Sequence, residues 1–218
     1  GNNSGQLGNN RNNSGTNLPT QVGSLSDGKY IKIAAGWYHS LGIKDDGSLW
    51  AWGHNGAGQV GDGSFINKQV PILIDAGNHG KWIAISAGES FSIGIKEDSS
   101  LWAWGANDLG QTSGGRSNVP VMIDDGYCLP WKAIDAGRHH ALGVKIDGSV
   151  WAWGSNAFGQ TGSGLPNNSM TPYMIPELSY MQQIILTAGK EHSMVTGIKQ
   201  PTQLPGKKSR NEYIEQCI

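Results

Sequence analysis

The sequence has little charge, little cysteine and no long apolar run, and each shortage argues against a class of protein. Charged residues make up 15% of the 218 residues, the formal net charge is −1, and the repeats hold no dense lysine or arginine cluster. We therefore expect no nucleic-acid partner and no attraction to anionic membranes. Cys128 and Cys217 are too few and too isolated for a disulfide framework or a zinc site, which leaves the cellular compartment open. No run of about 18 apolar residues occurs, so we expect no membrane span.

In place of these features the sequence carries a tandem repeat, marked by three short motifs that keep one phase along the chain. The tetrapeptide Trp-Ala-Trp-Gly ends at Gly53, Gly105 and Gly154. An Ala-Gly dipeptide before an apolar run places its glycine at Gly36, Gly88, Gly137 and Gly189. A Gly-Gln dipeptide places its glutamine at Gln6, Gln59, Gln111 and Gln160. Each motif returns after 49 to 53 residues, so the chain is built from units of that length.

Each full repeat predicts four short β-strands. In the first repeat, the runs at 30–34, 40–44, 48–52 and 70–74 are rich in Ile, Leu, Val and Trp and are bounded by Gly, Asp and Asn. Asp46-Gly47 and Asp147-Gly148 predict tight hairpin turns of type I′, which need positive φ at both central residues. The second repeat has Ser99-Ser100 at this place, which predicts a looser turn. Outside the C-terminus, no stretch shows a sustained helical period.

The fold class that follows is all-β, an arc of about four four-stranded β-propeller blades, three complete and two partial. Side chains alternate along a strand, so Trp50 and Trp52 share one face and Leu49 shares the other with Ala51. Neighbouring blades would bury both faces, and we interpret the tryptophan stripe as core rather than as a stacking platform for sugars or bases. The same interpretation holds for the tryptophans that begin the Ala-Gly strand, Trp82 and Trp131.

The motif positions also give the expected boundaries. We expect a partial blade at 1–29, blades at about 30–75, 82–124 and 131–176, and a partial blade at 181–200. Residues 201–218 are expected to form a C-terminal extension or linker, in which Ser209 and Glu212 resemble a capping box that opens a short helix. An open arc exposes two apolar ends. We therefore expect the chain to be a piece of a larger ring, or to associate with a second copy that closes one.

The residues from Ala35 to Gly53, followed by Gly58-Gln59-Val60-Gly61, resemble the regulator of chromosome condensation repeat. Matching strings at 87–111 and 136–162 extend the resemblance over most of the chain. It implies a seven-bladed ring that grips a partner with one of its ends. Members of the family include a nucleotide exchange factor for a small nuclear GTPase, domains of signalling proteins and secreted bacterial β-lactamase inhibitor proteins. The asparagine-rich N-terminus, in which only Arg11 is basic, differs from the basic arm of the chromatin-binding exchange factor.

The sequence offers no constellation for catalysis. No Ser-His-Asp grouping, HExxH or P-loop pattern is present. His39, His140 and His192 recur at one place in the repeat, with Phe91 in the second unit. Equivalent positions on different blades lie too far apart to share one metal ion, so we interpret these histidines as structural. We expect no catalytic residue, no metal site and no cofactor, and we predict that the chain is not an enzyme.

The two residues after each Ala-Gly glycine vary while their neighbours repeat, and we predict that they form a binding site. These pairs are Trp37-Tyr38, Glu89-Ser90, Arg138-His139 and Lys190-Glu191. Repeat symmetry places all four at one end of the propeller, in connections between strands, where binding residues concentrate. Surface loops that vary without any function would look the same. Trp37 and Tyr38 favour binding, because two adjacent exposed aromatic side chains are otherwise hard to explain.

The function predicted from these features is a non-catalytic module that binds a protein partner through the variable connections. Two alternatives stay open. Exposed Trp37 and Tyr38 would also suit a carbohydrate-binding propeller, in which aromatic rings stack on sugars. The family resemblance also allows nucleotide exchange on a small GTPase.

Overall fold

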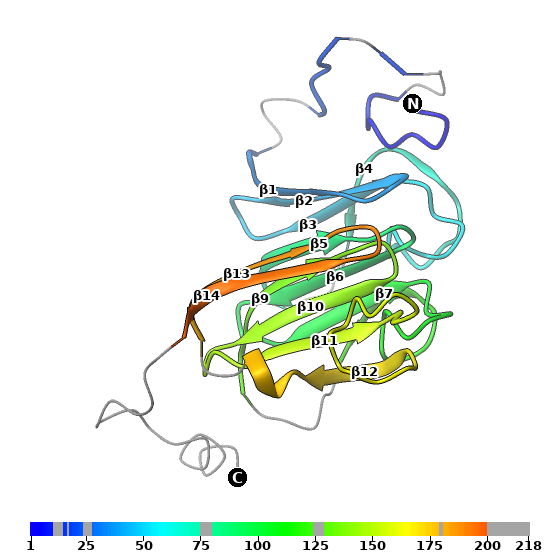
Figure 1. Ribbon diagram of the computed structural model, residues 1–218. Helices are drawn as coiled ribbons and strands as arrows, with labels where there is room; N and C mark the ends of the chain where they lie inside the picture. Colours follow the sequence, from blue (N-terminus) through cyan, green and yellow to red (C-terminus); the bar gives the residue numbers. More distant parts are fainter. Residues whose placement is uncertain are drawn as a thin grey trace.

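The computed structural model describes residues 1–10, 15–16, 18–23, 28–74, 80–123, 129–178 and 181–199. Within these ranges the strands form three four-stranded antiparallel sheets and one two-stranded sheet, packed side by side (Figure 1). This arrangement confirms the all-β propeller arc. The predicted extension and helix at 201–218 lie outside the described residues. In the described part of the chain, no helix is long and apolar enough to cross a membrane.

The sheets are consecutive blades, and their strands are hydrogen-bonded in chain order. Blade 1 consists of β1 (Tyr30–Ala35), β2 (His39–Lys44), β3 (Leu49–Gly53) and β4 (Lys68–Ile74). Blade 2 consists of β5 (Trp82–Ala87), β6 (Phe91–Lys96), β7 (Leu101–Gly105) and β8 (Ser117–Met122). Blade 3 consists of β9 (Trp131–Ala136), β10 (His140–Lys145), β11 (Val150–Gly154) and β12 (Ser169–Met174). After the 3-10 turn η2 (Pro176–Leu178), half-blade 4 adds β13 (Met181–Ala188) and β14 (Ser193–Lys199). Neighbouring blades meet along their first strands, so β5 lies between β1 and β9, and β13 packs on β9.

Every complete blade has two different faces, because side chains alternate along its strands. One face of blade 1 carries aliphatic side chains, among them the fully buried Leu41, Ile43 and Leu49. These residues pack on Trp82 and Trp104 of blade 2, which are 3% and 0% exposed. The interpretation of the tryptophan stripe as core is therefore confirmed. We call the two sides of a blade its aliphatic face and its tryptophan face.

The next two junctions follow the same rule. The aliphatic face of blade 2, with Ile93 and Ile95, packs on Trp131 and Trp153 of blade 3. The aliphatic face of blade 3 packs on half-blade 4, which contributes aliphatic side chains to the junction. The side chains in this last junction include Leu142, Val144, Val150, Ile184, Leu186 and Val195. Each blade therefore buries its aliphatic face on the blade that follows it in the chain.

The loop that follows each tryptophan strand crosses to the next blade. The carbonyl of Gln59, in the loop after β3, accepts hydrogen bonds from Trp104 Nε1 at 2.9 Å and from Ser92 Oγ at 2.8 Å, both in blade 2. The carbonyl of Gln111 accepts one from Trp153 Nε1 of blade 3 at 3.0 Å. These bonds satisfy indole N–H groups that would otherwise be buried without an acceptor. The recurring Gly-Gln motif is thus a link between blades.

His39 and His140 are buried links between blades, in agreement with their structural interpretation. His39 Nε2 lies 3.0 Å from Ser92 Oγ, and His140 Nε2 lies 2.9 Å from Ser193 Oγ. Each serine gives its single proton to a glutamine carbonyl, so the imidazole Nε2–H is the donor to the serine. Nδ1 of both rings is buried and has no partner among the described residues. Burial lowers the pKa of His39 to about 3 and that of His140 to about 4, so both rings are neutral at pH 7.

Each complete blade also holds a lysine ammonium group between aromatic rings. Lys96 is fully buried, and its Nζ lies 4.6 Å from the ring centroid of Trp82 and 4.0 Å from that of Trp102. Lys44 and Lys145 occupy the same place in blades 1 and 3. A cation over an indole face is stabilised by roughly 0.5–2 kcal/mol. The sequence signal for this arrangement is a lysine that ends the second strand of every complete blade.

The hairpins between the second and third strands are not the predicted type I′ turns. In blade 1, Lys44 N–H donates to Ser48 O at 3.0 Å and Gly47 N–H donates to Lys44 O at 2.9 Å. Of the three loop residues only Gly47 has positive φ, at 85°. The loop is therefore a type I turn followed by one left-handed residue. The prediction was wrong because an Asp-Gly pair is compatible with both types of turn. A type I′ hairpin has a loop of two residues, whereas this loop has a third residue, Asp45.

The turn of blade 2 is as tight as the others, in contrast to the prediction of a looser one. Ser99 N–H donates to Lys96 O at 2.8 Å, and Ser99 adopts the left-handed conformation (φ 66°) that Gly47 and Gly148 adopt elsewhere. Relief of this strain is worth roughly 1–2 kcal/mol, which exceeds the entropic cost of glycine, roughly 0.5–1 kcal/mol. We expect Ser99→Gly to raise the free energy of unfolding by about 0.5 kcal/mol in urea denaturation. The control Ser100→Gly should lower it, and a gain from the control instead would contradict the assignment.

Candidate binding surface

The four variable pairs lie in the connections between the first and second strands of successive blades. Glu89 N–H donates to Arg138 O at 3.0 Å, and Arg138 N–H donates to Gly189 O at 3.2 Å. Backbone hydrogen bonds therefore join the connections of blade 2, blade 3 and half-blade 4 into one continuous strip. We call the eight predicted residues on it the connection surface. They are Trp37, Tyr38, Glu89, Ser90, Arg138, His139, Lys190 and Glu191.

Arg138 lies at the centre of the connection surface and contacts three other connections. Its Nε forms an ion pair with Glu89 Oε2 of blade 2, and its Nη1 lies 3.7 Å from Glu191 Oε1 of half-blade 4. Its guanidinium carbon lies 4.8 Å from the ring centroid of Trp37 of blade 1. Arginine suits such a position because its planar, always charged head can pair with carboxylates and stack on a ring at once. The structure thus brings side chains of all four connections together around one guanidinium.

Trp37 and Tyr38 form the aromatic part of the surface. They are 45% and 50% exposed, and their ring centroids lie 6.4 Å apart in an edge-to-face arrangement. Tyr38 also lies edge-to-face against His54, with centroids 6.4 Å apart. His54 is a member of the site that the sequence did not point to. The sequence feature that could have indicated His54 is its position directly after the Trp-Ala-Trp-Gly motif. The residue at this position lies beside the connection, because His54 N–H donates a hydrogen bond to the Tyr38 carbonyl at 2.7 Å.

The remaining predicted residues differ in their contribution. His139 Nε2 lies 3.2 Å from Glu89 Oε2, and burial lowers the pKa of His139, so at pH 7 the ring is neutral and Arg138 is the charged partner of Glu89. Lys190 Nζ lies 3.6 Å from Glu191 Oε1 in an exposed pair, which adds little stability. Ser90 joins the surface through its backbone, whose carbonyl accepts a hydrogen bond from Ala106 N–H at 2.9 Å.

The arrangement is suited to recognition. It combines half-exposed aromatic rings with a guanidinium that its neighbours hold in place, which is the composition of protein-interface anchors. Its carboxylates are engaged with Arg138, His139 and Lys190. Across the described ranges, no group of three or more His, Cys, Asp or Glu side chains is placed to hold a metal ion.

The stacked blades with their unlike faces define a β-propeller arc, and the repeat identifies the family. Two models of the regulator of chromosome condensation (RCC1) repeat match the chain. One matches residues 30–59, 82–111 and 131–160, and the other matches 1–43, 46–95 and 147–196, well over half of the sequence. The chain belongs to the RCC1 repeat family.

Individual relatives match parts of the chain. It is 40% identical over 87 residues to the mitochondrial RCC1 domain-containing protein RUG3 of Arabidopsis thaliana, a match that covers 40% of this chain and 20% of RUG3. It is 33% identical over 101 residues to protein RCC2 of Mus musculus, covering 44% of this chain and 19% of RCC2. Prp20p of Saccharomyces cerevisiae has a similar structure, with a TM-score of 0.69 at 22% identity over 79% of this chain and 44% of Prp20p. The chain thus spans about a fifth of these curated relatives and less than half of Prp20p, whose likeness shows the fold.

Proposed function

We propose that this propeller arc binds a protein partner through the connection surface and catalyses no reaction of its own. The observation that carries the proposal is the stack of Trp37 on Arg138, which joins blades 1 and 3 in one half-exposed patch. Trp, Tyr and Arg dominate the binding energy of many protein interfaces. Because Glu89 and Glu191 already hold Arg138, the guanidinium loses little conformational freedom when a partner docks on it.

Charge on the surface also supports a protein as the partner. Glu89 and Glu191 balance Arg138 and Lys190, so the surface has no excess of positive charge for a phosphate backbone. Among similar structures, that of Prp20p is described together with its binding to Gsp1p and histones, and another has Kap60 bound to yeast RCC1. These are partners of Prp20p. For this chain they are the first probes.

Carbohydrate binding is the second candidate, and the half-exposed rings of Trp37 and Tyr38 are the observation that favours it. Sugars stack on open aromatic faces. Arg138 already covers one face of Trp37 within the arc, which leaves less of the ring for a sugar and favours a protein.

Binding measurements with immobilised chain test the proposal. The probes are Gsp1p, core histones and Kap60, with a glycan array beside them. We expect one of the proteins to bind, and we expect Arg138→Ala and Trp37→Ala to raise its Kd by about 30-fold each, the loss of roughly 2 kcal/mol that is typical of an interface anchor. Release of labelled nucleotide from Gsp1p, measured at low concentration of the chain, tests exchange activity in parallel.

Phe158→Ala is the matched control. Phe158 is 70% exposed in the loop after β11, outside the connection surface, and its removal should change Kd by less than about twofold. Equal losses from Phe158→Ala and Trp37→Ala would contradict the assigned surface. Glycan binding that Trp37→Ala abolishes, with no protein bound, would replace the proposal by the carbohydrate-binding alternative.

A further inference from the structure

The imidazole of His54 carries its hydrogen on Nε2, and the neighbouring Gln59 fixes this tautomer. Ala57 N–H donates to Gln59 Oε1 at 2.9 Å, so the amide nitrogen of Gln59 is the group that lies 2.9 Å from His54 Nδ1. An amide nitrogen can only donate, so Nδ1 accepts this bond and the ring hydrogen is on Nε2. His54 is half-buried, and its Nε2 has no hydrogen-bond partner among the described residues. The ring therefore offers one hydrogen-bond donor to a ligand.

Gly56, in the loop after β3, leaves room for this imidazole. A Cβ atom on Gly56 would lie 2.9 Å from Cε1 and 3.1 Å from Nε2 of His54, which is closer than side chains normally pack. Both residues are specific to blade 1, because blades 2 and 3 have other residues at these places. The counterparts are Ala106 and Ser155 for His54, and Asp108 and Ala157 for Gly56. The imidazole and the glycine that accommodates it therefore occur together in one blade of the three.

Arg116, directly before β8 of blade 2, binds to the same loop of blade 1. Its Nη2 donates to the Gly56 carbonyl, and its Nε donates to the Ala57 carbonyl at 3.3 Å. Its guanidinium carbon lies 5.1 Å from the ring centroid of Phe65. Two backbone hydrogen bonds and one aromatic ring thus position an exposed guanidinium at Gly56, the residue against which the imidazole of His54 lies.

Arg116 departs from the pattern of the repeat, which has asparagine at this place in blades 1 and 3. In blade 1, Asn67 Oδ1 accepts the Asn55 N–H at 2.8 Å. In blade 3, Asn168 Oδ1 accepts the Asn156 N–H at 2.9 Å. An arginine side chain has no acceptor atom, so blade 2 cannot form this bond. In its place, blade 2 has a cation that is bonded to blade 1.

The positive charge of Arg116 has no carboxylate partner among the described residues. Asp62, the acidic side chain of the loop after β3, is paired with Lys68 at 2.6 Å. Arg138 on the connection surface differs, because Glu89 forms an ion pair with it. A carboxylate from a partner would therefore meet an unpaired cation at Arg116, whereas at Arg138 it would meet a carboxylate that is already in place.

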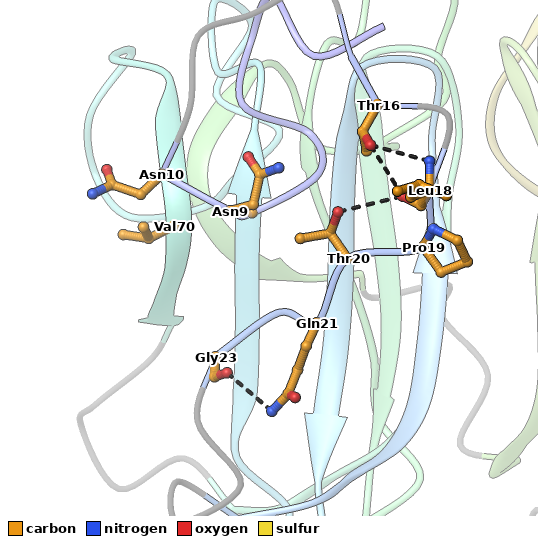
Figure 2. A pocket seen from close by; sticks show the side chains of 10 residues that line it. Asn9, Asn10, Thr16, Leu18, Pro19, Thr20, Gln21, Gly23 and Val70 are labelled. Carbon is orange, nitrogen blue, oxygen red and sulfur yellow. Dashed lines mark hydrogen bonds between the residues drawn. The ribbon is translucent and has the colours of Figure 1, made fainter.

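The hollow beside the N-terminal Gly-Gln unit has no comparable combination of groups. It measures about 550 Å³ and separates Asn9 and residues 16–23 from Val70 of β4 (Figure 2). The described residues that line it are all uncharged. The hydrogen bonds drawn there, such as that from Thr16 Oγ1 to the Leu18 carbonyl, stay within residues 16–23. These residues therefore cannot select a ligand by its charge.

We propose that Tyr38, His54, Gly56, Phe65 and Arg116 form a corner that binds the carboxylate of an aspartate or glutamate side chain on the protein partner. The donors are His54 Nε2–H and the N–H groups of Arg116 Nη1, and bonds from such donors to a charged acceptor are stronger than bonds to a neutral one. The rings of Tyr38 and Phe65 lie beside these donors and suit an apolar neighbour of the acidic residue. The inference rests on the proposed function, because Tyr38 joins the corner to the connection surface.

Titration of the isotope-labelled intact chain, followed by nuclear magnetic resonance, tests the proposal with two peptides that differ in one group. The probes are acetyl-Gly-Glu-Phe-amide and acetyl-Gly-Gln-Phe-amide, whose blocked ends leave the glutamate side chain as the only charge. We expect the glutamate peptide to bind with a Kd on the order of millimolar and the glutamine peptide about fivefold more weakly. The backbone signals of Tyr38, His54 and Gly56 should shift. Equal affinities, no binding, or shifts confined to other residues would overturn the proposal.

Two substitutions of the exposed Arg116 locate the charge that the glutamate peptide recognises. Arg116→Gln should abolish the preference for this peptide, whereas Arg116→Lys should keep part of it, because the positive charge remains. His54→Phe keeps a ring beside Tyr38 without the Nε2–H donor, and it should lower the preference about twofold. Circular dichroism shows whether the variants keep the fold.

Lys81→Gln is the matched control. It removes one exposed positive charge from blade 2 at the opposite end of β5, where the Lys81 N–H donates to Glu97 Oε1 at 3.2 Å. The fivefold preference should remain. Equal losses from Lys81→Gln and Arg116→Gln would show that the peptide responds to net charge and not to the corner. The preference between peptides is measured separately from the protein binding of Trp37→Ala, so this inference and the proposed function can each fail alone.

Discussion

Acidification from pH 7 to pH 5 is expected to destabilise the arc by several kcal/mol, and replacing one histidine link should remove about 2 kcal/mol of that loss. The folded pKa values of His39 and His140, about 3 and about 4, lie below the ordinary value of 6.5. Between the folded pKa of each histidine and its ordinary value of 6.5, the unfolded chain therefore binds more protons than the folded chain. Stability is complete above pH 6.5 and falls by about 1.4 kcal/mol per histidine for each unit of pH below it.

The replacement is His39→Phe with Ser92→Ala, which copies the Phe91–Ala141 pair of the second junction. Urea denaturation at pH 7, 6 and 5 should give a shallower loss of stability for this double variant than for the wild type. The reverse exchange, Phe91→His with Ala141→Ser, should give a steeper one. An unchanged slope in both variants would show that the buried imidazoles do not control the acid response.

Asp46 and Asp98 do not contribute to the loss of stability in this range of pH. Hydrogen bonds from Ser48 and Ser100 lower the pKa of Asp46 and Asp98, so both side chains stay ionised at pH 5. His139 also titrates below its ordinary value because of burial, and it is present in every variant, so its contribution cancels in the comparison.

Trp104→Ala is expected to lower the free energy of unfolding by about 3–5 kcal/mol. Trp104 is fully buried in the junction of blades 1 and 2, its ring lies 5.7 Å from that of Trp82, and its Nε1 donates to the Gln59 carbonyl. The alanine variant loses the contact area and leaves a cavity between the blades. It also leaves the Gln59 carbonyl with one donor fewer. The measurement is the shift of the urea midpoint, followed by tryptophan fluorescence.

Trp37→Ala is the control for this experiment. It removes the same side chain from an exposed place, where its contacts are the Arg138 stack and the edge of Tyr38. The expected loss is about 1 kcal/mol or less. Similar losses for Trp104→Ala and Trp37→Ala would contradict the different burial of the two rings.

The composition of the two faces of a blade could be predicted from the sequence, because the Trp-Ala-Trp-Gly motif alternates large aromatic and small side chains along one strand. Trp50 and Trp52 must point one way and Ala51 the other, and the tandem repeat provides a neighbour for each side. The place of the connection surface could be predicted for the same reason, since equivalent connections fall at one end of equivalent blades. Its use as a binding site remains a proposal.

Other features could not be predicted, because they depend on contacts between repeats or on loop length, which the spacing of the motifs does not determine. The stack of Arg138 on Trp37 joins blades 1 and 3 and depends on the curvature of the arc, which repeat spacing does not encode. The type of hairpin turn depends on one residue of loop length. The serine partner of His39 lies in the next repeat, so the histidine could be interpreted as structural while its hydrogen bond remained hidden.

The paired residues at the junctions also restrict how such a chain can change its length. Because every complete blade offers the same two faces, recombination between repeats can delete or duplicate a blade and still leave an aliphatic face against a tryptophan face. The pairs His39–Ser92, Phe91–Ala141 and His140–Ser193 restrict such deletions and duplications, because each pair needs matching partners on two successive blades. Loss of blade 2 would place His39 beside Ala141, and the buried imidazole N–H would lose its acceptor. The residue that follows the repeated histidine or phenylalanine of a blade must therefore match the histidine or phenylalanine of the preceding blade. These buried pairs, more than the shape of the faces, restrict the order in which the blades can follow one another.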